Sequence, residues 1–168
     1  MKHVVFLAFL CLNLAYNLLP DVIPTYPKKM YTCRNFDQRL QKTLKDAAEQ
    51  ISSSGFPVRL VNSQGSASII CNSSSIRFGS TFVNNSTFTS TLIENRMIHF
   101  PNAFFNTMMH ELLHAIGLDH SKGVPGMMSY SVRVEPSGAI IEDSQKLWLS
   151  IDDVFGLLHL TTIARRVT

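Results

Sequence analysis

The sequence has little charge and no long hydrophobic run. Charged residues make up 16% of the 168 residues, and the formal net charge is +3. Arg165 and Arg166 are adjacent near the end, but no basic stripe follows any segment, so we expect no nucleic-acid partner. The N-terminal apolar run, residues 4–12, is too short to span a bilayer. With no internal repeat and no interdomain linker, the chain is expected to form one globular domain.

The N-terminus has the pattern of a secretory signal. Lys2 and His3 precede the apolar run, which has the length typical of a signal-peptide core. We expect residues 1–17 to be a signal peptide cut near residues 15–17, residues 18–34 to be an extended lead-in, and residues 35–168 to be the folded domain. The protein is therefore expected to be secreted. The alternative is an uncleaved signal anchor that tethers it to a membrane.

Cysteine is scarce, with three in the chain. Cys11 lies in the apolar run, which leaves Cys33 and Cys71 as a pair suited to a disulfide in an oxidising compartment. Two free buried thiols are the alternative. In a secreted chain, three N-x-S/T sequons are possible glycosylation sites: Asn72, Asn84 and Asn85.

Apolar periodicity predicts the order helix, several strands, helix, loop, helix. Helices are expected over residues 35–52 and 103–118 and from Ser150 onward, with Asn102 capping the second and Ser150 and Asp153 forming a capping box on the third. Strands are expected over residues 56–62, 66–71, 76–82, 88–93 and 96–100. This order predicts an α+β fold with a small, mostly consecutive sheet.

Residues 110–120 read H-E-x-x-H-x-x-G-x-x-H. His110 and His114 lie one turn apart on one helix face, so both imidazoles can reach one metal ion. Gly117 allows a turn with positive φ that brings His120 back as a third ligand. Glu111 lies beside the first ligand and can reach a metal-bound water. The pattern predicts one catalytic Zn²⁺; the alternative is three histidines on a polar helix edge with no metal.

This extended motif resembles the signature of the metzincin zinc peptidases. The stretch 126–130, GMMSY, resembles their Met-turn, which places Met128 beneath the metal. The tyrosine of that stretch, Tyr130, would touch the metal or line the pocket or core. Residues 149–156, LSIDDVFG, are similar to the final helix of matrixins, the matrix-metalloproteinase group. In matrixins the first aspartate of this stretch, here Asp152, holds the mature N-terminal ammonium, and the second, here Asp153, fastens the Met-turn.

The resemblance implies a metzincin-type catalytic domain: a small, twisted, mostly antiparallel-edged sheet with an active-site helix, a Met-turn and a C-terminal helix. It also implies a secreted, monomeric zinc-dependent endopeptidase that acts on proteins or peptides, with Glu111 as general base. The substrate would pair with an edge strand near residues 86–93. The alternatives are a zinc-binding pseudo-protease that acts as a binding or inhibitory module, and a metal-free structural protein.

The sequence also departs from matrixins. No ligand pattern for a structural zinc or for calcium is evident, and His99 is interpreted as a strand histidine. No cysteine-switch motif precedes the domain, so its latency and the N-terminal role of Asp152 are in doubt.

Overall fold

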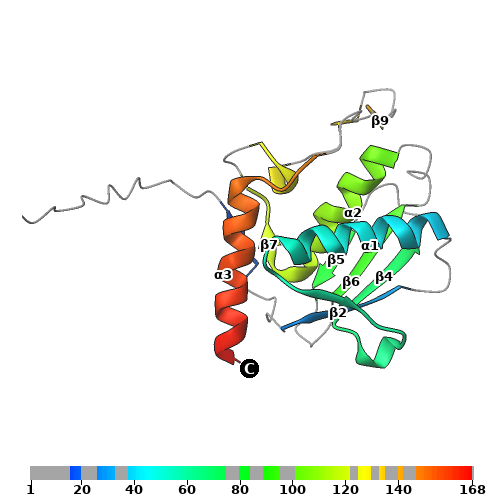
Figure 1. Ribbon diagram of the computed structural model, residues 1–168. Helices are drawn as coiled ribbons and strands as arrows, with labels where there is room; N and C mark the ends of the chain where they lie inside the picture. The colour runs from blue at the N-terminus through cyan, green and yellow to red at the C-terminus, as the bar shows by residue number, and fades with distance from the viewer. Residues whose placement is uncertain are drawn as a thin grey trace, which may run out of the picture.

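The computed structural model describes residues 16–19, 26–32, 38–74, 80–83, 89–94, 101–121, 125–129, 133–134, 140–141 and 147–167. These residues form an α+β arrangement in which the helices α1 (Gln38–Ser53) and α2 (Pro101–Ile116) pack against each other and against a sheet. The third helix, α3 (Ile151–Val167), stands to one side and runs across the direction of α1 (Figure 1). None of the described helices combines the length and apolar character needed to cross a membrane.

The main sheet has five strands in the order β3-β2-β4-β6-β5. They are β2 (Lys28–Thr32), β3 (Val58–Leu60), β4 (Ile69–Ser74), β5 (Ser80–Val83) and β6 (Thr89–Glu94). All neighbouring pairs are parallel except β5 with β6. The expected consecutive order is therefore wrong. Parallel neighbours need a crossover, which α1 provides between β2 and β3, and pairing between distant segments leaves no local pattern in the sequence.

Two other expectations about the strands change. The strand β2 falls in the segment 18–34 that was expected to be an extended lead-in, yet it lies inside the sheet between β3 and β4. Residues 86–93 were expected to form a substrate-binding edge. Their described part belongs to β6, which is paired on both sides, and the edges among the described strands are β3 and β5.

The core lies between the sheet and the two packed helices. Helix α1 buries Leu44, Ala47, Ala48 and Ile51, the spacing expected for one face of a helix, and exposes its charged residues on the other. Helix α2 is more deeply enclosed, and every side chain from Phe105 to Leu113 is buried. It begins at Pro101, so Asn102 lies in its first turn and is not the N-cap. Proline is common at this first position because a backbone N–H there would have no partner within the helix, so nothing is lost by its absence.

Short strand pairs lie outside the main sheet. β1 (Asn17–Leu18) pairs antiparallel with β7 (Leu118–Asp119), directly after α2. β8 (Arg133–Val134) pairs with β9 (Ile140–Ile141). The pair formed by β1 and β7 connects the N-terminal end of the described chain to the segment that follows α2.

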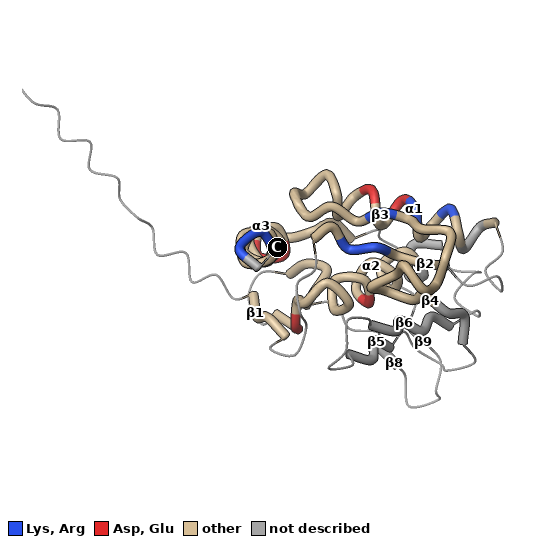
Figure 2. Tube along the Cα trace, turned by 90° about the horizontal axis from the view of Figure 1, so that it is seen from below, with Lys and Arg blue, Asp and Glu red and all other residues tan. Residues whose placement is uncertain are grey.

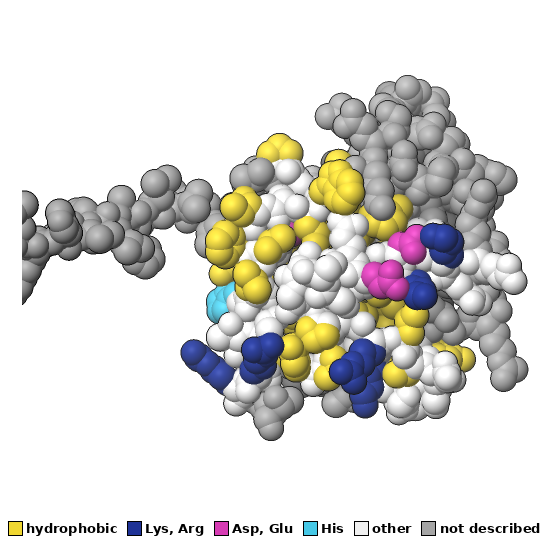
Figure 3. Space-filling model, viewed as in Figure 1, with side chains coloured by type: hydrophobic (Ala, Val, Ile, Leu, Met, Phe, Trp, Pro, Cys, Tyr) yellow, Lys and Arg dark blue, Asp and Glu magenta, His cyan; other side chains and the backbone are white. Residues whose placement is uncertain are grey.

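Exposed apolar side chains gather over α3. Ile151, Phe155 and Leu158 are exposed at helical spacing, and Trp148 just before the helix is 69% exposed. The space-filling view shows yellow side chains on this side of the molecule and the arginines at the C-terminal end of the helix (Figure 3). The opposite face of α3 buries Leu157, Leu160 and Ala164 against the rest of the domain.

Candidate metal centre

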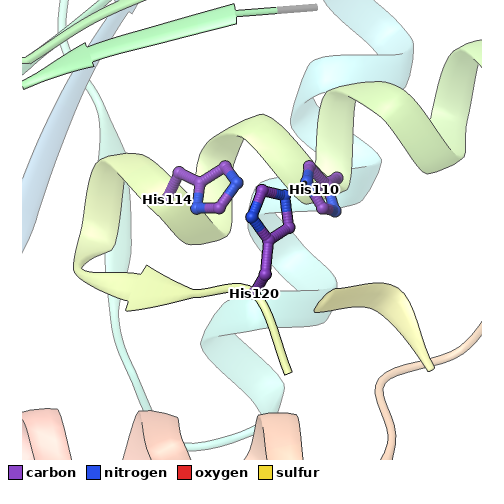
Figure 4. A group of neighbouring side chains, drawn as sticks. All are labelled: His110, His114 and His120. Carbon is purple, nitrogen blue, oxygen red and sulfur yellow. Dashed lines mark hydrogen bonds between the residues drawn. The ribbon is translucent and has the colours of Figure 1, made fainter. Parts of the chain in front are cut away.

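Three histidines meet where α2 ends. His110 and His114 lie on the last turns of α2, and His120 follows β7. The imidazole of His120 projects between the other two (Figure 4). Their candidate ligand atoms all lie within 4.8 Å of one another, and the Nε2 atoms of His110 and His120 are 3.2 Å apart. Two nitrogens on a tetrahedral zinc ion would be about 3.3 Å apart. The three residues could therefore hold a metal ion.

Backbone carbonyls orient two of the three rings. Nδ1 of His110 lies 2.8 Å from the carbonyl oxygen of Met127, and Nδ1 of His114 lies 2.7 Å from that of Leu118. A carbonyl only accepts, so in each ring Nδ1 carries the hydrogen and Nε2 keeps its lone pair for a metal. His120 has no such short contact among the described residues, and its Nδ1 is 3.7 Å from the Asp119 carboxylate.

Burial keeps two of these rings neutral. Desolvation lowers the pKa of His110 to about 4, and it also lowers the pKa of His114. The hydrogen bonds that the two rings donate to the carbonyls of Met127 and Leu118 raise the pKa, but this effect is smaller than that of desolvation. Neutral imidazole is the form that binds a metal, so protons do not compete for these two ligands at neutral pH.

Gly117 makes the turn from α2 into β7. Its φ is +128°, a conformation that residues with a Cβ rarely adopt, and its N–H donates to the carbonyls of Leu113 and His114 at the helix end. The chain reverses here, which allows His120 to return toward the two helical histidines.

The turn η3 (Met127–Ser129) is held by the start of α3. The Asp153 carboxylate accepts hydrogen bonds from the backbone N–H groups of Met127 (3.0 Å), Met128 (3.3 Å) and Ser150 (2.7 Å). The Ser150 hydroxyl in turn accepts from the Asp153 N–H at 3.1 Å, which completes the predicted capping box. Both methionines are buried, and the Met128 carbonyl accepts from the Ser121 N–H. The helix cap thus fixes the turn that orients His110.

Gly126 allows the turn η3 to pack closely against the start of α3. A Cβ added at Gly126 would lie 2.3 Å from the Cβ of Ser150, so no larger residue fits without movement of the backbone. This glycine was not singled out in the sequence because nothing local signals a close approach to residue 150.

Glu111 lies directly after His110 and is 7% exposed. Its position on α2 beside the first histidine is the one that the motif predicts for a general base. Its catalytic role remains a prediction.

Several predicted residues lie outside the described part of the chain: Cys33, Asn84, Asn85, His99 and Tyr130. The backbone of Asn72 lies in β4, and Cys71 is buried in the same strand. Cys71 pairs in register with Thr32, the residue that precedes Cys33 in the sequence. The disulfide, the glycosylation sites and the role of Tyr130 remain predictions.

One contact to the site was not predicted from the sequence. The side-chain Nδ2 of Asn17 donates to the backbone carbonyl of His120 at 2.8 Å. Asn17 was expected at the end of the signal peptide, and 103 positions separate it from His120, so no local pattern signals the contact.

Comparisons with known proteins identify a similar fold but no family. No family model matches the sequence, and no curated protein matches it. One solved structure, described as the GM1 bound form of the ECX AB5 holotoxin, resembles the chain with a TM-score of 0.55 and 16% identity over 80% of each chain. At this identity the likeness concerns the fold alone, and the binding of GM1 is a property of that protein.

That comparison corrects the expected fold class. The similar structure is described as a holotoxin and not as a metzincin, so the comparison gives no support to the expected metzincin fold class. The reason is physical: residues 110–120 determine one helix end and one turn, and such a site can be carried by different folds. The chain is an α+β protein with a largely parallel five-stranded sheet, and its three histidines form a site that could hold a metal ion.

Proposed function

We propose that the protein is a secreted, zinc-dependent endopeptidase. The observation that carries the proposal is the convergence of His110, His114 and His120 beside Glu111. Three imidazoles suit zinc, and three protein ligands leave a coordination position open, as a catalytic site requires and a closed structural site does not. The resemblance of residues 110–121 to the metzincin signature supports the same activity at the level of the motif.

The residues of the site would act as metal ligands, as groups that orient those ligands, and as a general base. His110, His114 and His120 would hold the ion, with Met127 and Leu118 fixing two of the rings through their carbonyls. Zinc, when bound, supplies a Lewis acid that makes a water molecule acidic and polarises the scissile carbonyl. The Glu111 carboxylate accepts the proton of the attacking water and delivers it to the leaving amine.

The sheet edge β5 offers a place for an extended substrate. It is paired with β6 on one side, and it is in contact with α2, the helix that carries two of the ligands. An extended peptide can add to such an edge through backbone hydrogen bonds, largely independent of its sequence. This arrangement fits a peptidase that acts on unfolded or flexible segments of proteins.

The test is cleavage of a peptide library by the purified protein. Removal of metal with a chelator is expected to abolish cleavage, and stoichiometric Zn²⁺ is expected to restore it. Glu111→Gln is expected to lower turnover by about 10²- to 10⁴-fold, the usual contribution of a general base, while zinc content is unchanged. Glu49→Gln, at an exposed glutamate of α1, is the matched control.

Two results would contradict the proposal. Cleavage that persists in Glu111→Gln would show that another residue, or a contaminant, is responsible. Stoichiometric zinc without cleavage of any peptide would instead assign the protein to the pseudo-protease class, in which the site binds metal for recognition or inhibition.

A further inference from the structure

Residues 16–19, which we name the N-terminal strap, run along the segment that carries His120. Asn17 pairs with Asp119 and Leu18 with Leu118 in the β1–β7 ladder. The Leu19 N–H donates to the Gly117 carbonyl at 2.8 Å, and the Asn17 side chain donates to the His120 carbonyl at 2.8 Å. The strap therefore bonds to the whole length of chain between the end of α2 and the third ligand.

The strap is also held from its other side by α3. The Tyr16 hydroxyl lies 3.0 Å from Nδ1 of His159, and their rings meet edge to face. A Cβ added at Gly156 would lie 2.6 Å from the side chain of Leu118 and 3.4 Å from the ring of Tyr16. Viewed along α3, β1 lies beside this helix (Figure 2). A glycine in the helix thus lets the strap and β7 approach it closely.

His120 needs this support more than the other two ligands do. Its side chain is 65% exposed, and no described residue gives its Nδ1 the short backbone contact that orients His110 and His114. Groups that orient a metal ligand from outside the coordination sphere commonly change metal affinity by about 10- to 100-fold. The described contacts that position His120 act on the backbone. On one side the Asn17 side chain of the strap donates to the His120 carbonyl, and on the other the N–H of the next residue, Ser121, donates to the Met128 carbonyl.

We propose that the N-terminal strap positions His120 for metal binding, with Asn17 as the positioning residue. The inference rests on the three-histidine site and not on peptidase activity, so it can fail or succeed whether or not the protein cleaves peptides.

The strap also sets a limit on N-terminal processing. The signal sequence predicts cleavage near residues 15–17. A cut after Ala15 leaves the whole strap, whereas a cut after Asn17 removes both Tyr16 and the donor to His120. We therefore expect the processed protein that binds metal to begin at Tyr16 or earlier.

Asn17→Asp tests the positioning role in the full chain. Aspartate has the same shape as asparagine but, when ionised, donates no hydrogen bond to the carbonyl. We expect its affinity for Zn²⁺, measured by competition with a chromophoric chelator, to fall by about tenfold. The visible spectrum of bound Co²⁺ is expected to change as well, because it reports the geometry of the ligands. Asn62→Asp, at an exposed asparagine remote in sequence from the strap and the histidine motif, is the matched control.

Conservative and independent variants complete the test. Asn17→Gln keeps the amide donor and is expected to retain more of the affinity than Asn17→Asp. Gly156→Ala should weaken zinc binding by displacing the strap and β7 together. Wild-type zinc affinity and an unchanged Co²⁺ spectrum in Asn17→Asp would overturn the positioning role. Equal losses in Asn17→Asp and Asn62→Asp would do so too.

The processing limit has its own measurement. The protein expressed with its own N-terminal segment in a secretory host is expected to show, by intact mass, a chain that starts at Tyr16 or upstream. A secreted, zinc-loaded form that starts at Asn17 or later would overturn the limit.

Discussion

His110 connects the chemistry of the site to the stability of the protein. Burial lowers its pKa to about 4, whereas the usual value is near 6.5. Between these values the unfolded chain binds a proton at His110 and the folded chain does not. The unfolded state therefore binds more protons, and the free energy of unfolding falls as the pH falls through this window.

We expect the metal-free protein to lose stability from about pH 6.5 to about pH 4, with His110 contributing on the order of 3 kcal/mol. The measurement is urea unfolding of the metal-free wild type and of His110→Gln across this range. The difference between the two proteins isolates His110, because the other titrating groups are common to both. A difference that does not vary with pH would contradict the expected burial of a neutral ring.

Gly117 is the second residue whose replacement has a defined consequence. Alanine at a φ of +128° carries backbone strain of about 1–3 kcal/mol. Gly117→Ala is therefore expected to lower the free energy of unfolding by that amount and to weaken zinc binding, since the turn delivers His120. Gly65→Ala is the control because an added Cβ there meets only the Ser63 Oγ, at an ordinary van der Waals distance of 3.8 Å, so its effect should stay within about 0.5 kcal/mol. Equal effects of the two variants would show that the turn is not under this constraint.

At the level of elements, the start of α3 stabilises the site from a distance. One carboxylate, Asp153, accepts three backbone hydrogen bonds, two of them from the turn that contains Met127. Because Met127 orients His110, loss of this carboxylate should affect both folding and the metal site.

Asp153→Ala is expected to lower the free energy of unfolding by about 2–4 kcal/mol, since it leaves buried N–H groups without an acceptor, and to weaken zinc binding. Asp46→Ala, which removes an exposed ion pair with Lys42 on α1, should change stability by less than about 1 kcal/mol. Chemical denaturation and chelator competition measure the two effects. Full stability of Asp153→Ala would contradict the role of the helix cap.

The elements differ in how far the sequence determines them. All three helices were predicted, because apolar spacing and the Ser150–Asp153 capping box are local signals. The sheet order was not predicted, because the parallel pairing of β4 with β6 depends on contacts between segments that carry no mutual signal. For the same reason the pairing of β1 with β7 was not predicted. The three histidines beside this pair were predicted from their spacing alone.

At the level of the whole molecule, the register of the sheet bears on the predicted disulfide. Thr32 of β2 pairs with Cys71 of β4, and Cys33 follows Thr32 in the chain. We expect the secreted protein to lack free thiols at both positions, as shown by alkylation and mass spectrometry before and after reduction. Reduction is expected to lower the free energy of unfolding by about 3–4 kcal/mol, because the bridge closes a long loop in the unfolded chain. Alkylation of Cys33 and Cys71 in the unreduced, denatured protein would contradict the pairing.

The supports of the metal centre come from both ends of the chain. The strap is made first, the three histidines follow, and Asp153 and Gly156 are synthesised last. A nascent chain that has emerged from the ribosome as far as His120 has every ligand but neither the helix cap that holds the Met127 turn nor the surface against which the strap packs. If the site takes up zinc, we therefore expect uptake to follow the synthesis of α3, and we expect a chain that terminates before α3 to carry the complete motif and yet bind zinc poorly.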